Sequence, residues 1–105
     1  QLITQRFSSQ PDPHWYTMWF TTEQVGVWNW ERFSEEEFDR LQKEGAVETD
    51  PAKRDIIYKR MQDLMEESGC YRFITHESAP ILYRNTVIPA MNPEGVPIAR
   101  DFKKA

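Results

Sequence analysis

The sequence predicts an α+β fold in the order strand, aromatic loop, two helices, strands and tail, and three observations lead to it. Residues 2–8 alternate apolar and polar side chains as a strand does. Two helix-start patterns follow, at residues 33–38 and at residues 50–51. After Gly69 the alternation returns at residues 71–76. A chain that begins and resumes in strands around a helix pair is expected to be part of a larger sheet.

The N-terminal third is predicted to be a strand, a proline-bounded loop and a short aromatic helix. The expected strand runs from Leu2 to Ser8, and Pro11 and Pro13 mark the loop that follows it. Residues 14–20 are expected to form a short helix, with the rings of Trp15 and Trp19 on one face. Residues 21–31 lack a helical period and are expected to be an ordered loop.

The first long helix is predicted from a capping box. Ser34 and Glu37 have the spacing in which the two side chains bond reciprocally to unpaired backbone N–H groups. Phe33 and Phe38 are spaced as the accompanying hydrophobic staple. This helix is expected to continue to about Val47.

The second long helix is predicted to begin at Asp50-Pro51, because proline fits the first helical turn. Gly69 supplies its expected C-terminal cap. Strands are expected at residues 71–76 and 79–83, and an irregular tail from Asn85. The inward face of the helix is expected to consist of apolar residues at helical spacing, namely Ile57, Met61, Leu64 and Met65.

The composition of the chain limits the classes of protein to which it can belong. The 105 residues are 39% hydrophobic and 29% charged, which predicts one small folded domain. A net charge of −4 without a basic cluster argues against nucleic-acid binding. Cys70 is the single cysteine, so no intrachain disulfide can form. No segment is apolar enough to predict a membrane span or a signal peptide. A start within a strand pattern suggests that the chain is a truncated product.

Signatures of catalysis and of metal binding are absent from the sequence. The carboxylates of residues 35–39 fit the positive end of a helix dipole without any catalytic role. His14 and His76 are far apart and are expected to be structural rather than metal ligands. The sequence therefore predicts a binding protein without a cofactor, a metal or an enzymatic activity.

Aromatic residues are concentrated between Trp15 and Phe38. Within this stretch Trp28-Asn29-Trp30 places two rings around an amide, a combination suited to stacking on a ligand and hydrogen bonding to it. The alternative is that both rings pack against the helices that follow. The residues alone leave the two interpretations equally supported.

Several motifs resemble the family 5 extracellular solute-binding proteins, the receptors of peptide, dipeptide and nickel ABC transporters. The resemblance covers nearly the whole chain and rests on the two helix starts in the family's order, the proline-rich element ahead of them and the strand behind them. These segments are residues 33–39, residues 48–54, Tyr58, Met61-Gln62, residues 10–13 and residues 73–76.

The resemblance implies the C-terminal portion of a two-lobed periplasmic binding protein of type II. Residues 1–88 would belong to its second, ligand-binding lobe, and residues 89–105 would return toward the first lobe. Such a receptor closes on a small polar solute and delivers it to the ABC transporter permease, its one connection to the membrane. The implied ligand contacts are Ser8, Ser9, Gln10, Trp28, Asn29 and Trp30.

The resemblance leaves the solute open. In peptide-binding members an Asp pairs with the ligand's amino terminus, and the matching residue here is Ser9. A neutral Ser cannot form a charge-assisted bond, which weakly favours a sugar or an opine-like compound over a peptide. A different class of function is a stand-alone protein–protein interaction module with an exposed aromatic face. An enzyme completed by other segments is a third possibility.

Overall fold

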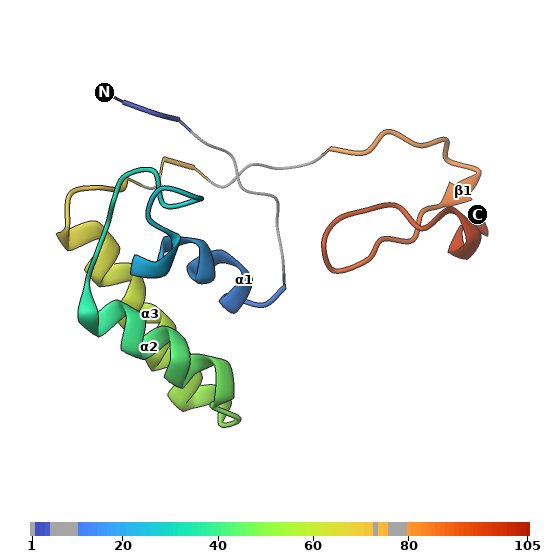
Figure 1. The fold of residues 1–105 in the computed structure, drawn as a ribbon. Coiled ribbons are helices and arrows are strands. Elements are labelled where there is room, and N and C mark those ends of the chain that lie inside the picture. The colour runs from blue at the N-terminus through green and yellow to red at the C-terminus, as the bar shows by residue number, and fades with distance from the viewer. Residues whose placement is uncertain (1, 5–10, 73, 76–79) are drawn as a thin grey trace. The chain divides into compact units, whose positions relative to one another are not determined.

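The computed structural model describes residues 2–4, 11–72, 74–75 and 80–105. The chain is helix-rich α+β, with helices α1, α2 and α3 and a two-stranded sheet. It divides into two compact units, residues 12–74 and residues 1–11 with 75–105. The first is called the helical unit below, and the second the terminal unit (Figure 1). The division into lobes at residue 88 concerns a larger protein and stays a prediction.

The helical unit begins with short helices. α1 spans His14–Thr17 and passes directly into a 3₁₀ turn at Met18–Phe20. A second 3₁₀ turn, Thr22–Gln24, follows. The expected helix over residues 14–20 is therefore present, with its second half wound more tightly. The expected ordered loop at residues 21–31 is also present and contains the second turn.

α2 (Glu36–Val47) and α3 (Pro51–Glu67) form a helical hairpin that is the largest part of this unit (Figure 1). Asp50 caps α3, and its Oδ1 accepts hydrogen bonds from the backbone N–H groups of Ala52 and Lys53 at 2.8 and 3.2 Å. Gly69 has a φ of 69°, the left-handed conformation expected after a helix. Both predictions for α3 are confirmed.

The predicted capping box at α2 is wrong. Glu35 is the N-terminal cap, one residue later than expected, and it makes no side-chain capping bond. The Ser34 hydroxyl instead lies 3.1 Å from the Thr22 hydroxyl, and Glu37 forms an ion pair with Arg60 of α3 at 3.0 Å. The side chains of Ser34 and Glu37 therefore bond to residues of other elements and not to the backbone at the start of α2. The predicted contact between Phe33 and Phe38 is present, with ring centroids 5.1 Å apart.

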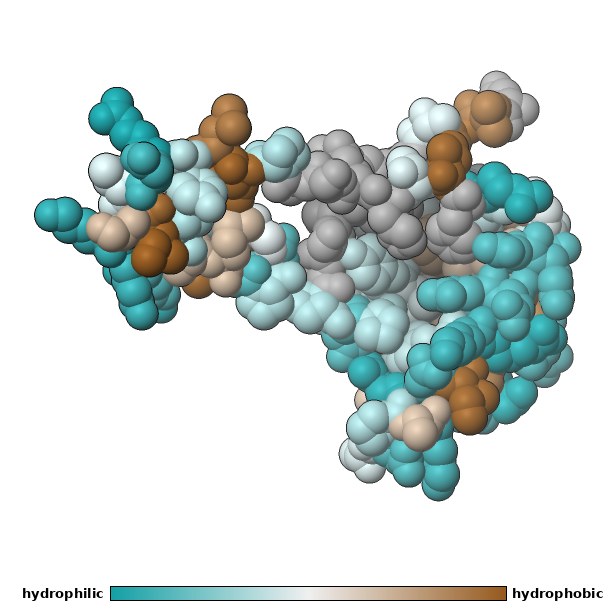
Figure 2. Space-filling view, turned by 180° about the vertical axis from the view of Figure 1, so that it is seen from behind, coloured by the Kyte–Doolittle hydropathy of each residue, from teal (hydrophilic) through white to brown (hydrophobic). Residues whose placement is uncertain are grey.

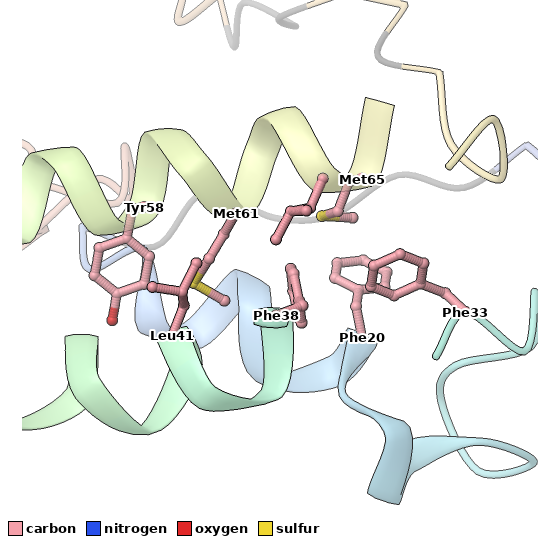
Figure 3. Packing of buried hydrophobic residues seen from close by; sticks show 8 residues of the cluster. Phe20, Phe33, Phe38, Leu41, Tyr58, Met61 and Met65 are labelled. Atoms are coloured by element: carbon pink, nitrogen blue, oxygen red, sulfur yellow. The ribbon is translucent and has the colours of Figure 1, made fainter. Parts of the chain in front are cut away.

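The core lies where the hairpin meets the segment that precedes it (Figure 3). Met61, Leu64 and Met65 are buried as predicted, and Ile57 is half-buried at the margin. Gly45 allows the helices to approach closely, because a Cβ there would lie 2.9 Å from Cζ of Tyr58. The buried apolar residues are Phe20, Phe33, Phe38, Leu41, Tyr58, Met61, Leu64 and Met65.

The terminal unit contains the sheet, in which β1 (Val87–Ile88) pairs antiparallel with β2 (Lys103–Lys104). A 3₁₀ turn at Ala99–Asp101 lies between them, and an isolated bridge joins Met91 to Pro97. The prediction of an irregular tail from residue 85 missed this pairing. The pairing of β1 with β2 depends on contacts between residues distant in the sequence. A strand of two residues is too short to show an alternating pattern of polarity.

The strands predicted at residues 2–8, 71–76 and 79–83 are not present in the parts of these segments that the structure describes. Residues 5–8, 73, 76 and 79 lie outside the described residues. Alternation alone does not make a strand, because each strand needs a neighbour to which its backbone can bond. No helix in the described part of the chain is long and apolar enough to cross a membrane.

Candidate functional site

The candidate site is the aromatic loop, residues 21–33, and Asn29 organises it. Asn29 has none of its surface exposed. Its Nδ2 lies 3.1, 3.1 and 2.6 Å from the carbonyl oxygens of Phe20, Thr21 and Phe33. Its Oδ1 accepts a hydrogen bond from the Phe33 N–H at 2.9 Å. One amide thus joins the two ends of the loop, a network that rigidifies when it is fully satisfied.

Further hydrogen bonds hold the first half of the loop. The carbonyl of Gln24 accepts from the N–H groups of Val27, Trp28 and Asn29 at 3.0, 3.1 and 3.0 Å. The Thr22 N–H donates to Oδ1 of Asp39, on the first turn of α2, at 2.9 Å. The loop is therefore fixed both to itself and to the helical hairpin.

Two tryptophan rings of this ordered loop face solvent. Trp28 is 52% exposed and Trp30 is 48% exposed. Trp28 also packs edge-on against Trp19, with ring centroids 5.3 Å apart. The indole N–H of Trp30 donates to the Val27 carbonyl at 2.8 Å. These rings offer apolar contact faces at low conformational cost, because the loop beneath them is already ordered.

Arg32 adopts a left-handed backbone conformation near the end of the loop, with a φ of 59°. It is the one non-glycine residue with positive φ among those the structure describes. A side chain in this region costs roughly 1 kcal/mol or more, and such strain concentrates at functional positions. The surrounding hydrogen bonds, including that from the Arg32 N–H to the Asn29 carbonyl at 3.4 Å, hold the conformation.

Tyr71, which follows α3 in the sequence, also contacts the aromatic loop. Its ring packs edge-on against Phe20 and Phe33, with centroid separations of 5.0 and 5.7 Å. Its hydroxyl lies 3.5 Å from Oδ1 of Asn29 and 3.4 Å from Oε2 of Glu31. Burial and the Glu31 carboxylate raise the pKa of Tyr71, so its hydroxyl stays protonated at neutral pH.

The six residues predicted to contact a ligand have different outcomes. Ser8, Ser9 and Gln10 lie outside the described residues, so their role stays a prediction. Trp28 and Trp30 present half of their surfaces to solvent, as a contact role requires. Asn29 is buried and bonded within the loop, which gives its amide a structural role. Local sequence patterns missed Tyr71, because its loop neighbours are about forty residues away.

A second polar cluster lies where α1 meets the hairpin. Oδ1 of Asp12 accepts from Nη2 of Arg54 at 2.7 Å and from the His14 N–H at 2.8 Å. Nε2 of Gln42 lies 2.9 Å from Nδ1 of His14. The Arg54 hydrogen bond holds the pKa of the Asp12 carboxyl below its ordinary value. His14 is thus part of a structural hydrogen-bond network.

The hollow beside this cluster has a volume of about 700 Å³ and is a weaker candidate site. Four of its five charged side chains already pair with one another, Arg54 with Asp12 and Lys59 with Asp55, each at 2.7 Å. The fifth, Glu48, accepts a hydrogen bond from the Asp50 N–H at 2.8 Å. Few charges remain for a ligand. Its lining residues are Asp12, Pro13, Ala46, Glu48, Thr49, Pro51, Arg54, Asp55, Tyr58, Lys59 and Gln62.

Among the residues that the structure describes, no three His, Cys, Asp or Glu side chains group as metal ligands would. In the comparisons with known proteins, no family model, no curated protein and no solved structure matched the chain. The geometry of the aromatic loop and the sequence motifs are therefore the features that indicate a function.

Proposed function

We propose that this chain is the C-terminal part of a periplasmic solute-binding protein that supplies an ABC transporter permease. In this role the aromatic loop contributes one wall of the ligand cleft. Trp28 and Trp30 contact the solute through their ring faces, and polar groups elsewhere in the cleft orient it. The ligand is a small polar solute: a peptide, a sugar or an opine-like compound.

The observation that carries the proposal is an ordered loop with two half-exposed tryptophans. Asn29 and Gln24 use their hydrogen-bonding groups to fix the backbone beneath the rings. A loop that served the core alone would bury its rings, whereas Trp28 and Trp30 remain about half exposed. Preorganised aromatic surface is the kind that binds ligands with little loss of conformational entropy.

The surface of the terminal unit supports the proposal that this chain belongs to a larger protein. None of its described residues is buried, and it exposes large apolar side chains (Figure 2). Leu82 is 99% exposed, and Leu2 is 93% exposed. Large apolar side chains that are almost wholly exposed are suited to contact with a partner surface. The sequence motifs favour the other parts of a two-lobed receptor as the partner surface that covers these side chains.

The direct test is mass spectrometry under non-denaturing conditions on the mature protein that contains this chain, as purified from its source. We expect a co-purified small polar molecule that is released on denaturation. A protein that carries no small molecule, and gains no thermal stability from a peptide and sugar library, would contradict the proposal.

A pair of substitutions locates the contact on the loop. Trp28→Ala should weaken solute binding by about tenfold, the scale of one lost aromatic contact. Trp15 is 53% exposed but lies on α1, outside the loop, so Trp15→Ala is the matched control and should bind normally. Equal losses in both variants would remove the loop from the binding site.

The second candidate is a protein–protein interaction module that uses the same exposed aromatic face. Val27, at 60% exposure beside Trp28, favours this function because it widens the apolar surface. The size of the bound partner distinguishes the two candidate functions. A module should bind a macromolecule in sedimentation experiments and should carry no co-purified solute.

A further inference from the structure

Tyr71 contacts the aromatic loop at both of its ends and in its middle. Phe20 precedes the loop and Phe33 closes it, and the Tyr71 ring packs edge-on against both. The Tyr71 hydroxyl lies within 3.5 Å of the side chains of Asn29 and Glu31, in the middle of the loop. No other residue described outside the loop has both kinds of contact with it.

The two neighbours of the hydroxyl are both acceptors. Oδ1 of Asn29 already accepts the Phe33 N–H, and Oε2 of Glu31 is a carboxylate oxygen. The single proton of the hydroxyl bonds to one of them at a time. Because Asn29 and Glu31 flank Trp30, the hydroxyl contacts the side chains on both sides of the residue that carries the exposed ring.

We propose that Tyr71 is a positioning residue for solute binding, which holds the aromatic loop in the conformation that presents Trp28 and Trp30. The inference rests on the proposed function and adds a residue to it. The solute need not touch Tyr71. Its effect is on the fraction of molecules in which the two rings are correctly placed, and affinity falls in proportion to that fraction.

The test is Tyr71→Phe, which keeps both ring contacts and removes only the hydroxyl. The readout is hydrogen exchange of the Trp30 indole N–H, followed by NMR. This proton bonds to the Val27 carbonyl, so its exchange reports how often this contact between two loop residues breaks. We expect its exchange to quicken about three- to tenfold, the factor that one net hydrogen bond represents. Amide exchange within α3 should not change.

Two further variants sharpen this test. Tyr83→Phe, at an exposed tyrosine of the terminal unit, should leave Trp30 exchange unchanged. Glu31→Gln keeps an acceptor near the hydroxyl but removes the charge, and should quicken exchange less than Tyr71→Phe does. Unchanged Trp30 exchange in Tyr71→Phe would overturn the proposal. So would an equal increase in α3, because the variant would then have loosened the whole unit.

Binding is measured separately, with the small-molecule extract released by denaturing the purified protein. Added back to ligand-free protein, this extract should raise the melting temperature of Tyr71→Phe less than that of the unmodified protein. An equal rise in both would overturn the positioning role. If the extract shifts neither protein, the proposed function fails, while the exchange measurement still decides whether Tyr71 orders the loop.

Discussion

The helical unit and the terminal unit use apolar residues in opposite ways. The helical unit buries eight of them around α2 and α3, with Phe38 and Met61 fully enclosed. The described part of the terminal unit buries none, although Leu82, Ile88 and Val96 are as apolar as the core residues. Composition is therefore not what separates the units. A helical hairpin with one apolar face closes a core by itself, whereas a two-residue strand pair needs another surface.

This difference assigns separate tasks to the units. The helical unit supplies a rigid base for the aromatic loop, through Asn29 and the contact between Thr22 and Asp39. The terminal unit contributes surface for which we propose a cover from the rest of a receptor. Substitutions in the helical unit should therefore change the free energy of unfolding more than substitutions in the terminal unit do.

Core truncation should give the largest effect. Phe38→Ala removes a ring that is wholly buried against Phe33, and should lower the free energy of unfolding by about 3–5 kcal/mol. Phe102 in the terminal unit is 37% exposed, and Phe102→Ala should cost less than about 1 kcal/mol. Urea denaturation measures both, followed by tryptophan fluorescence for the helical unit and by hydrogen exchange of residues 80–105 for the terminal unit, because all four tryptophans lie in the helical unit. Similar losses would mean that the terminal unit also has a core.

Removal of the Asn29 side chain should have the next largest effect. Asn29→Ala leaves the Phe33 N–H and the carbonyl groups of Phe20 and Phe33 without the side-chain partner they have now, whereas the Thr21 carbonyl keeps the Gln24 N–H. We expect a loss of about 2–3 kcal/mol, the scale for buried polar groups left unsatisfied. Asn85→Ala, at an exposed position of the terminal unit, is the control and should change little. Denaturation midpoints that move equally would contradict the structural role of Asn29.

The two helix starts should differ within the helical unit. Asp50→Ala removes two capping bonds from α3 and should destabilise by about 1 kcal/mol. Ser34→Ala removes only an exposed contact with Thr22, so we expect less than about 0.5 kcal/mol. Thermal unfolding by circular dichroism compares the two. A larger effect at Ser34 would restore the capping box that the sequence predicted.

The smallest expected effect is a pH dependence from Asp12 and Arg54. Because the folded-state pKa of Asp12 is lowered, the folded protein holds this carboxylate unprotonated more readily than the unfolded chain does. Its stabilisation is complete above the ordinary pKa of 3.8 and is lost as pH falls through the folded-state value.

The Asp12 side chain is 44% exposed, so this pair contributes at most about 1 kcal/mol. The difference in unfolding free energy between the unmodified chain and Asp12→Asn should therefore be measurable at pH 6 and shrink toward zero as the pH falls through the lowered folded-state pKa of Asp12. A difference that grows on acidification would have the wrong sign for this account.

Sequence patterns predicted the parts of the fold that depend on near neighbours. α3 has its cap at Asp50, its buried Met61 and its terminal Gly69 because each follows from residues within a few positions. The predicted cap at Ser34 was wrong because Thr22 and Arg60, distant in sequence, engage Ser34 and Glu37.

Whether Trp28 and Trp30 bind a ligand stays a prediction, and the sequence anticipated only part of the geometry of the loop that carries them. Clustered aromatic residues indicated Trp28 and Trp30, but alternation of polarity could not show that Asn29 faces inward. Tyr71 and Gly45 act through residues on other elements. Such contacts are consequences of packing, and a single sequence carries no local signal for them.

Hydrogen–deuterium exchange resolved along the chain tests the central contrast most directly. We predict slow exchange across α2, α3 and the bonded amides of Val27, Trp28 and Asn29, and fast exchange throughout the described residues 80–105. This pattern would establish the helical unit as a self-sufficient base for the aromatic loop. Equal protection in residues 80–105, or rapid exchange of the loop amides, would contradict the account.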